Sequence, residues 1–229
     1  MEMNVEKNKK KYILIGIIVG CILLVGGTYA LLSSDLIVNN GNVNGIVDCF
    51  QIDYNISNDG SNTNTGITGV LFPTKSVKGG LSGKVAININ ASCDVGGTGT
   101  LYLNVGSGTS TTLVQTVAAH CEKSDTLETL DSYTTSGACT SNGGRWVSNG
   151  TALKYAVYPS SDITGAALTK GYITANDIGK DITIYDNFSV SKTVKNYYIY
   201  IWMDGYLAGD GYENLPFGGS IHAKVVQTD

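Results

Sequence analysis

The sequence is poor in proline, in charged residues and in histidine, and each shortage narrows the possible functions. Only 3 of the 229 residues are proline, and 15% are charged. The two histidines, His120 and His222, lie far apart, and the sequence contains no Cys-x-x-Cys pair, no His-Glu-x-x-His motif and no Gly-x-Ser-x-Gly motif. No candidate catalytic or cofactor-binding residue stands out, so we predict that the protein is not an enzyme and has no cofactor.

Basic charge is also scarce outside the N-terminal end. The first 11 residues hold two acidic residues and four lysines, which leaves 17 acidic against 11 basic residues in the rest of the chain. Such a balance does not attract nucleic acid or an anionic lipid surface, and we expect neither as a partner. Glycine is abundant instead, with 29 residues. Low charge together with many glycines is typical of an extracellular β protein with many turns.

The longest apolar run follows the four N-terminal lysines. We expect residues 1–11 to form a cytoplasmic basic tail, and the uncharged run from Tyr12 to Leu32 is long enough to cross a bilayer as a helix. The same run has the features of a cleavable signal peptide, in which the small residues Thr28 and Ala30 permit cleavage after Ala30. Two localisations stay open: a single-pass cell-membrane protein with an extracellular C-terminal domain, or a protein secreted after cleavage.

The rest of the chain predicts a tether and one all-β domain. Residues 33–44 are polar, rich in asparagine and without periodicity, which is typical of a tether. Residues 45–229 alternate period-2 apolar patterns with glycine-rich turns. They predict an antiparallel β-sandwich, jelly-roll or immunoglobulin-like, of about seven to nine strands. Residues 106–150 interrupt the pattern and are interpreted as an inserted loop with a helical turn.

Five stretches carry the clearest strand signals. Residues 50–56 alternate apolar with polar side chains, and residues 219–227 do the same at the end of the chain. Residues 85–93 and 101–105 alternate on either side of a glycine-rich stretch, which predicts a hairpin. Residues 197–203 are apolar at every position, as in a strand that is covered on both faces.

Four cysteines follow the N-terminal apolar run, and an even number of them predicts two disulfides. Three pairings are possible. We favour Cys121 with Cys139, which are close in sequence, and Cys49 with Cys93. Cys93 shares the apolar face of its expected strand but Cys49 does not, so Cys49 must either precede its strand or lie at a bulge. A metal site is the alternative use of these cysteines, although their spacing does not favour it.

Two further groups of residues are candidate binding sites. Asp204, Asp210 and Glu213 place three carboxylates in a short glycine-rich stretch, and carboxylate oxygens are preferred ligands of Ca²⁺. Their spacing is not that of an EF-hand, and Asp-Gly pairs are also common in turns. Arg145 and Trp146 in the insertion could form a binding platform. The alternative is that Trp146 covers the nearby disulfide.

Residues 26–30, Gly-Gly-Thr-Tyr-Ala, followed by Asp35, resemble the processing site of Gram-positive secreted proteins that are matured by the SipW-type signal peptidase. The TasA-like biofilm matrix fibre proteins and the camelysins belong to this group. Residues 44–49, 85–93 and 221–227 resemble the opening, second and closing strands of their domains. The resemblance implies a jelly-roll-like β-sandwich that can enter extracellular fibres, with the mature N-terminal segment donated as a strand to the next subunit.

These observations give three hypotheses for function. The first is an extracellular surface structural or adhesive protein and, by the resemblance, a subunit of a biofilm fibre. Its partners would be the membrane, through residues 12–32, and further copies of itself or a cell-surface polymer. The second is a ligand-binding surface module that uses residues 106–150. The third is a metalloprotease like the camelysins, for which the sequence offers no evident set of ligands.

Overall fold

A computed structural model describes residues 49–56, 65–163, 165–209 and 211–228. All of them belong to one compact unit of the chain. None of the helices in these ranges is both long enough and apolar enough to cross a membrane.

Three predictions for the N-terminal part of the chain lie outside the described residues. They are the basic tail at residues 1–11, the transmembrane or signal helix at residues 12–32 with cleavage at Ala30, and the tether at residues 33–44.

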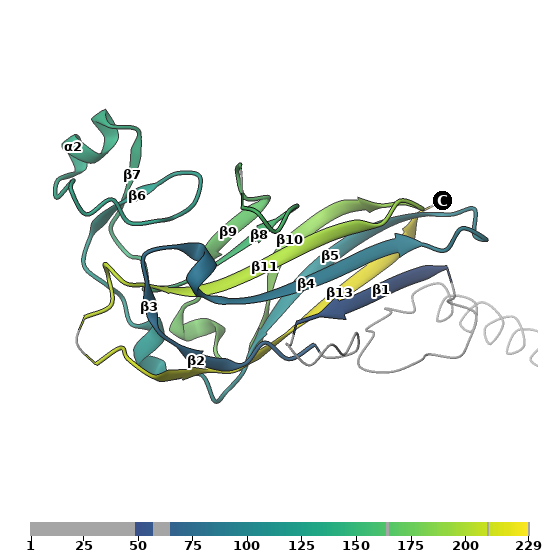
Figure 1. Ribbon diagram of the computed structural model, residues 1–229, viewed down its shortest axis with the longest axis horizontal. Coiled ribbons are helices and arrows are strands. Elements are labelled where there is room, and N and C mark those ends of the chain that lie inside the picture. Colours follow the sequence, from purple (N-terminus) through teal and green to yellow (C-terminus); the bar gives the residue numbers. More distant parts are fainter. Residues whose placement is uncertain (1–48, 57–64, 164, 210, 229) are drawn as a thin grey trace, which may run out of the picture. The chain divides into compact units, whose positions relative to one another are not determined.

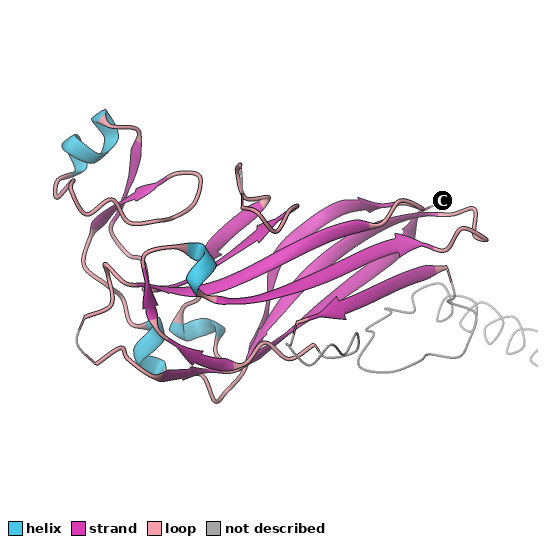
Figure 2. Cartoon of the chain, viewed as in Figure 1, coloured by secondary structure: helices cyan, strands magenta, loops and turns pink. Residues whose placement is uncertain are grey.

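The described chain consists almost entirely of β-strands and loops (Figure 2). The strands are β1 (Phe50–Asn55), β2 (Gly69–Leu71), β3 (Pro73–Thr74), β4 (Leu81–Ile89), β5 (Gly96–Val105), β6 (His120–Lys123), β7 (Gly144–Val147), β8 (Leu153–Tyr158), β9 (Thr169–Tyr172), β10 (Lys180–Val190), β11 (Lys195–Asp204), β12 (Leu215–Phe217) and β13 (Gly219–Thr228). The helices are short: η1 (Val77–Gly79), η2 (Thr111–Val114), α2 (Ser136–Ser141) and η3 (Ala175–Asp177). The all-β class that the sequence predicts is confirmed.

Two main sheets contain most of the long strands (Figure 1). The larger sheet has the order β1-β4-β11-β8-β9, and β3 adds a short parallel pairing to the end of β11. The smaller sheet has the order β10-β5-β13. All strand pairs other than β3 with β11 are antiparallel. The pairs β12-β2 and β6-β7 form separate two-stranded sheets.

One hydrophobic core joins the two main sheets. Alternate residues of β4, β5 and β13 are buried in it, because successive side chains of a strand point to opposite faces of a sheet. The buried residues of these three strands include Val85, Ile87, Ile89, Leu101, Leu103, Val105, Ile221, Ala223 and Val225. The period-2 patterns predicted from the sequence are therefore confirmed for these strands.

The predicted hairpin between residues 85–93 and 101–105 is wrong, because β4 lies in the larger sheet and β5 in the smaller one. The glycines taken for a turn lie inside β5. A Cβ atom added to Gly99 would stand 2.1 Å from the ring of Phe188, and one added to Gly97 would stand 2.7 Å from the ring of Phe50. These glycines make room for aromatic rings and do not break the strand.

Strand β11 is buried on both faces, as its uniformly apolar sequence predicts. Tyr197, Ile199, Ile201 and Met203 face the main core. Its other side chains lie on the face of the larger sheet that is turned away from the smaller sheet, which we call the outer face. A second cluster of buried residues covers this outer face: Val77, Leu127, Ala156, Tyr158, Tyr200 and Trp202.

The insertion at residues 106–150 contains η2, β6, α2 and β7, and the last three lie together at one end of the larger sheet (Figure 1). The predicted helical turn is present as α2, whereas the β6-β7 hairpin was not predicted. Leu127, between β6 and α2, belongs to the cluster on the outer face of the sheet. The segment between β6 and α2 is therefore packed against the outer face of the larger sheet.

Both disulfides have the pairing that the sequence favours. Cys49 and Cys93 are bonded, as are Cys121 and Cys139. Cys49 directly precedes β1 and Cys93 follows the end of β4, so both lie outside the regular strands and the facing problem does not arise. The backbone N–H of Asn90 donates a hydrogen bond of 2.7 Å to the carbonyl oxygen of Cys49, which extends the pairing of β1 with β4 as far as the disulfide.

We expect the two disulfides to stabilise the domain unequally. The cysteines of the first disulfide are 44 residues apart and those of the second are 18 residues apart. In the chain-entropy model the two bonds then contribute about 4 and about 3 kcal/mol, respectively, to the unfolding free energy. Replacing Cys49 and Cys93 with serine should cost more than replacing Cys121 and Cys139. Urea unfolding of the two double variants measures the difference, and an equal or reversed loss would contradict the prediction.

Candidate functional site

The most unusual side chain of the domain is a lysine with no exposed surface. Lys154 lies in β8, where almost every neighbour in the sequence is also buried. Trp202 of β11 stands directly across from it on one side and Tyr172 of β9 on the other. Lys154 therefore lies on the outer face of the larger sheet, beneath the insertion.

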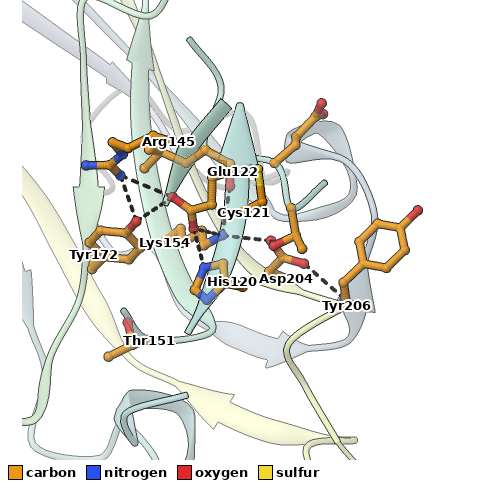
Figure 3. A network of polar contacts seen from close by, with 12 residues as sticks. His120, Cys121, Glu122, Arg145, Thr151, Lys154, Tyr172, Asp204 and Tyr206 are labelled. Atoms are coloured by element: carbon orange, nitrogen blue, oxygen red, sulfur yellow. Dashed lines mark hydrogen bonds and ion pairs between the residues drawn. The ribbon is translucent and has the colours of Figure 1, made fainter. Parts of the chain in front are cut away.

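The ammonium group of Lys154 has an acceptor for each of its three hydrogens (Figure 3). Its Nζ atom lies 2.6 Å from Oε1 of Glu122, 2.7 Å from Oδ2 of Asp204 and 2.7 Å from the carbonyl oxygen of Leu127. Glu122 and Leu127 belong to the insertion, whereas Asp204 ends β11. A buried charge that lacks partners is very costly, and here every hydrogen is matched.

Asp204 is held from two further directions. The Thr129 hydroxyl donates a hydrogen bond of 2.8 Å to Oδ2, the same oxygen that contacts Lys154. The backbone N–H of Tyr206 donates a hydrogen bond of 3.0 Å to Oδ1. Both oxygens of this carboxylate are therefore fixed in position.

Glu122 is the second carboxylate that contacts Lys154, and it connects the lysine to further polar side chains, which together we call the Lys154 cluster. Its Oε1 lies 2.8 Å from Nε2 of His120, and its Oε2 accepts hydrogen bonds from the hydroxyl of Tyr172 and from Arg145. Burial on its own would raise the pKa of Glu122. The hydrogen bond with His120 and the charge of Lys154 outweigh it, and together with the other donors they lower the pKa from 4.5 to about 2. Glu122 is therefore a carboxylate at neutral pH.

Tyr172 and Arg145 form the rim of the cluster. The hydroxyl of Tyr172 donates to Glu122 and accepts a hydrogen bond of 2.7 Å from Arg145. Burial and the hydrogen bond to Glu122 both raise the pKa of Tyr172, so it stays protonated. The side chain of Arg145 is about half exposed, with 48% of its surface open. The guanidinium group therefore marks the point where the cluster meets the solvent.

The backbone at Leu127 is in an uncommon conformation. Its φ angle is 60°, in the left-handed region that residues with a side chain seldom adopt. This residue is not a glycine, and it is buried against the outer face of the sheet. Its carbonyl oxygen is the one that accepts from Lys154. An unfavourable backbone conformation is thus maintained at the point where the insertion meets the lysine.

The arrangement joins three segments that are far apart in the sequence. Lys154 and Asp204 come from adjacent strands of the larger sheet, and Glu122 comes from the insertion. Two carboxylates share one ammonium group in a place that water does not reach. Such a cluster can fix the insertion in one position, and it also holds the nitrogen of Lys154 in contact with two carboxylates.

The structure describes two of the three calcium candidates, Asp204 and Glu213. The carboxylate of Asp204 is buried and fully engaged with Lys154, Thr129 and Tyr206, whereas Glu213 is exposed and Asp210 lies outside the described residues. In the described ranges there is no group of three or more His, Cys, Asp or Glu side chains that could hold a metal ion.

The predicted platform of Arg145 and Trp146 is divided between two faces. The two residues are neighbours in β7, so their side chains point to opposite sides of the β6-β7 hairpin. Arg145 turns toward Glu122, and Trp146 stands opposite Cys121 of the disulfide. The position of Trp146 fits the alternative that it covers the disulfide.

Glu122, Lys154, Tyr172 and Thr129 belong to no motif in the sequence and were not predicted as site residues. A signal for Lys154 was present, because it is the one charged residue in a strand of otherwise apolar residues, Leu153–Tyr158. Asp204 likewise follows a run in which both faces are apolar. A charge within such a strand predicts a buried partner, but the sequence does not reveal which residue that partner is.

Comparisons with protein-family models, with curated proteins and with solved structures found no match to this chain.

We predict that replacing Lys154 with methionine strongly destabilises the fold. The change keeps the volume of the side chain but leaves Asp204 without a cation and Glu122 with Arg145 alone, which costs about 3–5 kcal/mol of unfolding free energy. Urea unfolding measures the loss. The matched control is Lys123→Met, which breaks the exposed pair with Glu128 and should cost at most about 1 kcal/mol. Equal effects of the two changes would contradict the prediction.

We also predict that acid weakens the domain through Glu122. The folded-state pKa of about 2 lies below the ordinary value of 4.5, so the contribution of Glu122 is complete above pH 4.5 and is lost as the pH falls through 2. Its size is on the order of 3 kcal/mol. Urea unfolding over this pH range should show the loss in the wild-type chain and not in Glu122→Gln. Parallel losses in both proteins would refute the assignment to Glu122.

Proposed function

We propose that the protein is an extracellular surface structural or adhesive protein that acts without catalysis and can serve as a subunit of a fibre or biofilm matrix. The observation that carries this proposal is the way the insertion is fastened to the sheet. A disulfide closes the insertion internally, and the buried Lys154 cluster holds it against the outer face of the larger sheet. Reinforcement of a loop-rich segment in this way suits a domain that must keep its shape outside the cell.

The strand order supports a jelly-roll sandwich as the fold of this protein. The eight main strands, in chain order, are β1, β4, β5, β8, β9, β10, β11 and β13. We count these eight strands from one to eight. The larger sheet then has strands two, seven, four and five side by side, which are β4, β11, β8 and β9. The smaller sheet has strands eight, three and six side by side, which are β13, β5 and β10. This is the order of strands in a jelly roll. The first strand departs from it by pairing with β4.

The two disulfides support an extracellular location, because such bonds persist in oxidising compartments and are rare in the cytosol. The basic tail and apolar run at residues 1–32 would deliver the domain across the membrane. The Gly-Gly-Thr-Tyr-Ala sequence that ends at Ala30 would then decide whether the domain remains anchored or is released.

An edge of the smaller sheet supports self-assembly. Strand β13 pairs with β5 on one side, and on its other side no strand of the described chain pairs with it. Residues 65–67 form hydrogen bonds with Gly219 and Ile221 at the start of that edge. The N–H of Ala223 donates to the hydroxyl of Tyr54, so an added strand would pair with this edge beyond Ala223, as in other proteins that grow by strand addition.

The N-terminal sequence of the protein recovered from cells tests the proposal. We expect a chain that begins at or near Leu31 in the culture medium or cell-surface fraction, and fibres of that material in electron micrographs. A chain that begins at Met1 and is found only in the cytoplasm would contradict the proposal. Proteolytic activity that a chelator abolishes would instead support a metalloprotease.

A pocket in the insertion favours a ligand-binding surface module as the second candidate function. It has a volume of about 430 Å³ and is open to solvent. Its lining includes Lys123, Asp125, Tyr133 and Asn142. Binding of a cell-surface glycan that is lost in Tyr133→Ala, together with a strictly monomeric mature chain, would favour this candidate over assembly.

A further inference from the structure

We propose that Lys154 and Asp204 condense into an intramolecular isopeptide bond, and that Glu122 is the catalytic residue that moves the proton. The bond would join adjacent strands of the larger sheet covalently. This proposal does not depend on whether the protein is anchored, released or assembled.

The reacting groups are held in contact by the sheet itself. Nζ of Lys154 lies 2.7 Å from Oδ2 of Asp204. Residue 154 stands across from Trp202, two positions before Asp204, so the lysine and the aspartate are diagonal neighbours on the same face of β8 and β11. Two groups fixed in this way react as parts of one molecule with a high effective concentration.

Both reacting groups are shielded from water. Lys154 has no exposed side-chain surface and Asp204 has 3%. The reaction requires that a proton pass from Nζ to the aspartate, and water does not compete for either group in such a place. The transfer leaves a free amine, which is a nucleophile, beside a carboxylic acid, which can lose its hydroxyl as water.

The step balances without any other reactant. The Nζ amine of Lys154 attacks Cγ of Asp204 and forms the C–N bond. Oδ2 leaves Cγ as water, carrying the proton that came from the ammonium group and a second proton, which Glu122 takes from the attacking nitrogen and passes on. The products are one amide and one water molecule, and no oxidant or reductant takes part.

The remaining contacts of Asp204 suit this reaction. The backbone N–H of Tyr206 donates to Oδ1, the oxygen that would carry negative charge in the tetrahedral intermediate and then remain as the amide carbonyl. The hydroxyl of Thr129 donates to Oδ2, the oxygen that leaves. Each oxygen therefore has a donor that matches its part in the reaction.

Glu122 is placed to act as the base and not as the site of attack. Its Oε1 lies 2.6 Å from Nζ, within reach of the proton that the nitrogen must lose. Its other oxygen is held by Tyr172 and Arg145, which stabilise the carboxylate anion. A carboxylate that stays charged is a poor electrophile, so Asp204 and not Glu122 should receive the amine.

Mass spectrometry of the full chain tests the proposal directly. After reduction of the disulfides and proteolysis, the peptides that contain Lys154 and Asp204 should appear as one branched species, lighter than the two free peptides by one water molecule. The state of the N terminus does not affect this measurement. Free peptides in the folded wild-type protein would overturn the proposal, and so would a branch that joins Lys154 to Glu122.

Variants test the role of each group. Lys154→Arg keeps the positive charge but cannot form the amide, so its peptides should be separate. Glu122→Gln keeps the shape of the side chain and should slow formation of the bond at least tenfold after refolding, as followed by the branched peptide. Lys123→Arg, in the exposed pair with Glu128, is the matched control and should form the bond at the wild-type rate. An unchanged rate in Glu122→Gln would remove Glu122 from the reaction.

Discussion

The requirement that a buried charge be fully paired organises one whole side of this domain. Lys154 carries its ammonium group onto the outer face of the larger sheet, where it has no contact with solvent. Only groups from other segments can satisfy it, and they come from β6, from the loop at Leu127 and from the end of β11. The insertion must therefore settle in the one position that brings Glu122 and the Leu127 carbonyl to the lysine.

This constraint also explains why the larger sheet has two buried faces. The inner face packs against the smaller sheet in the main core. The outer face would expose Tyr158, Tyr200 and Trp202 if the insertion, η1 and the chain after β8 did not cover it. Apolar contacts and the ion cluster thus act together, because the aromatic residues supply a large buried area while the paired charges define the position of the segment that covers them.

The sequence was sufficient where the periodicity of a strand decides the outcome. It predicted the strands around Ile87, Ile201 and Ala223, the double burial of β11 and the two disulfides. It predicted a turn where a glycine in fact makes room for a side chain that is distant in the sequence, as Gly99 does for the ring of Phe188. It also failed at the ion cluster, because Glu122, Lys154 and Asp204 are separated by long stretches of chain. Only the pairing of β8 with β11 and the docking of β6 bring them together.

Stability alone is a weak reason for a cluster of this kind. Apolar residues of similar volume in place of a buried ion cluster often give an equal or more stable fold. The cluster also requires an unfavourable backbone conformation at Leu127. What apolar residues would not provide is a single defined position for the insertion, or an amine held 2.7 Å from a carboxylate oxygen with a second carboxylate at the same nitrogen. The geometry therefore argues for specificity of docking and for reactivity, and these are the properties that separate this site from an ordinary core.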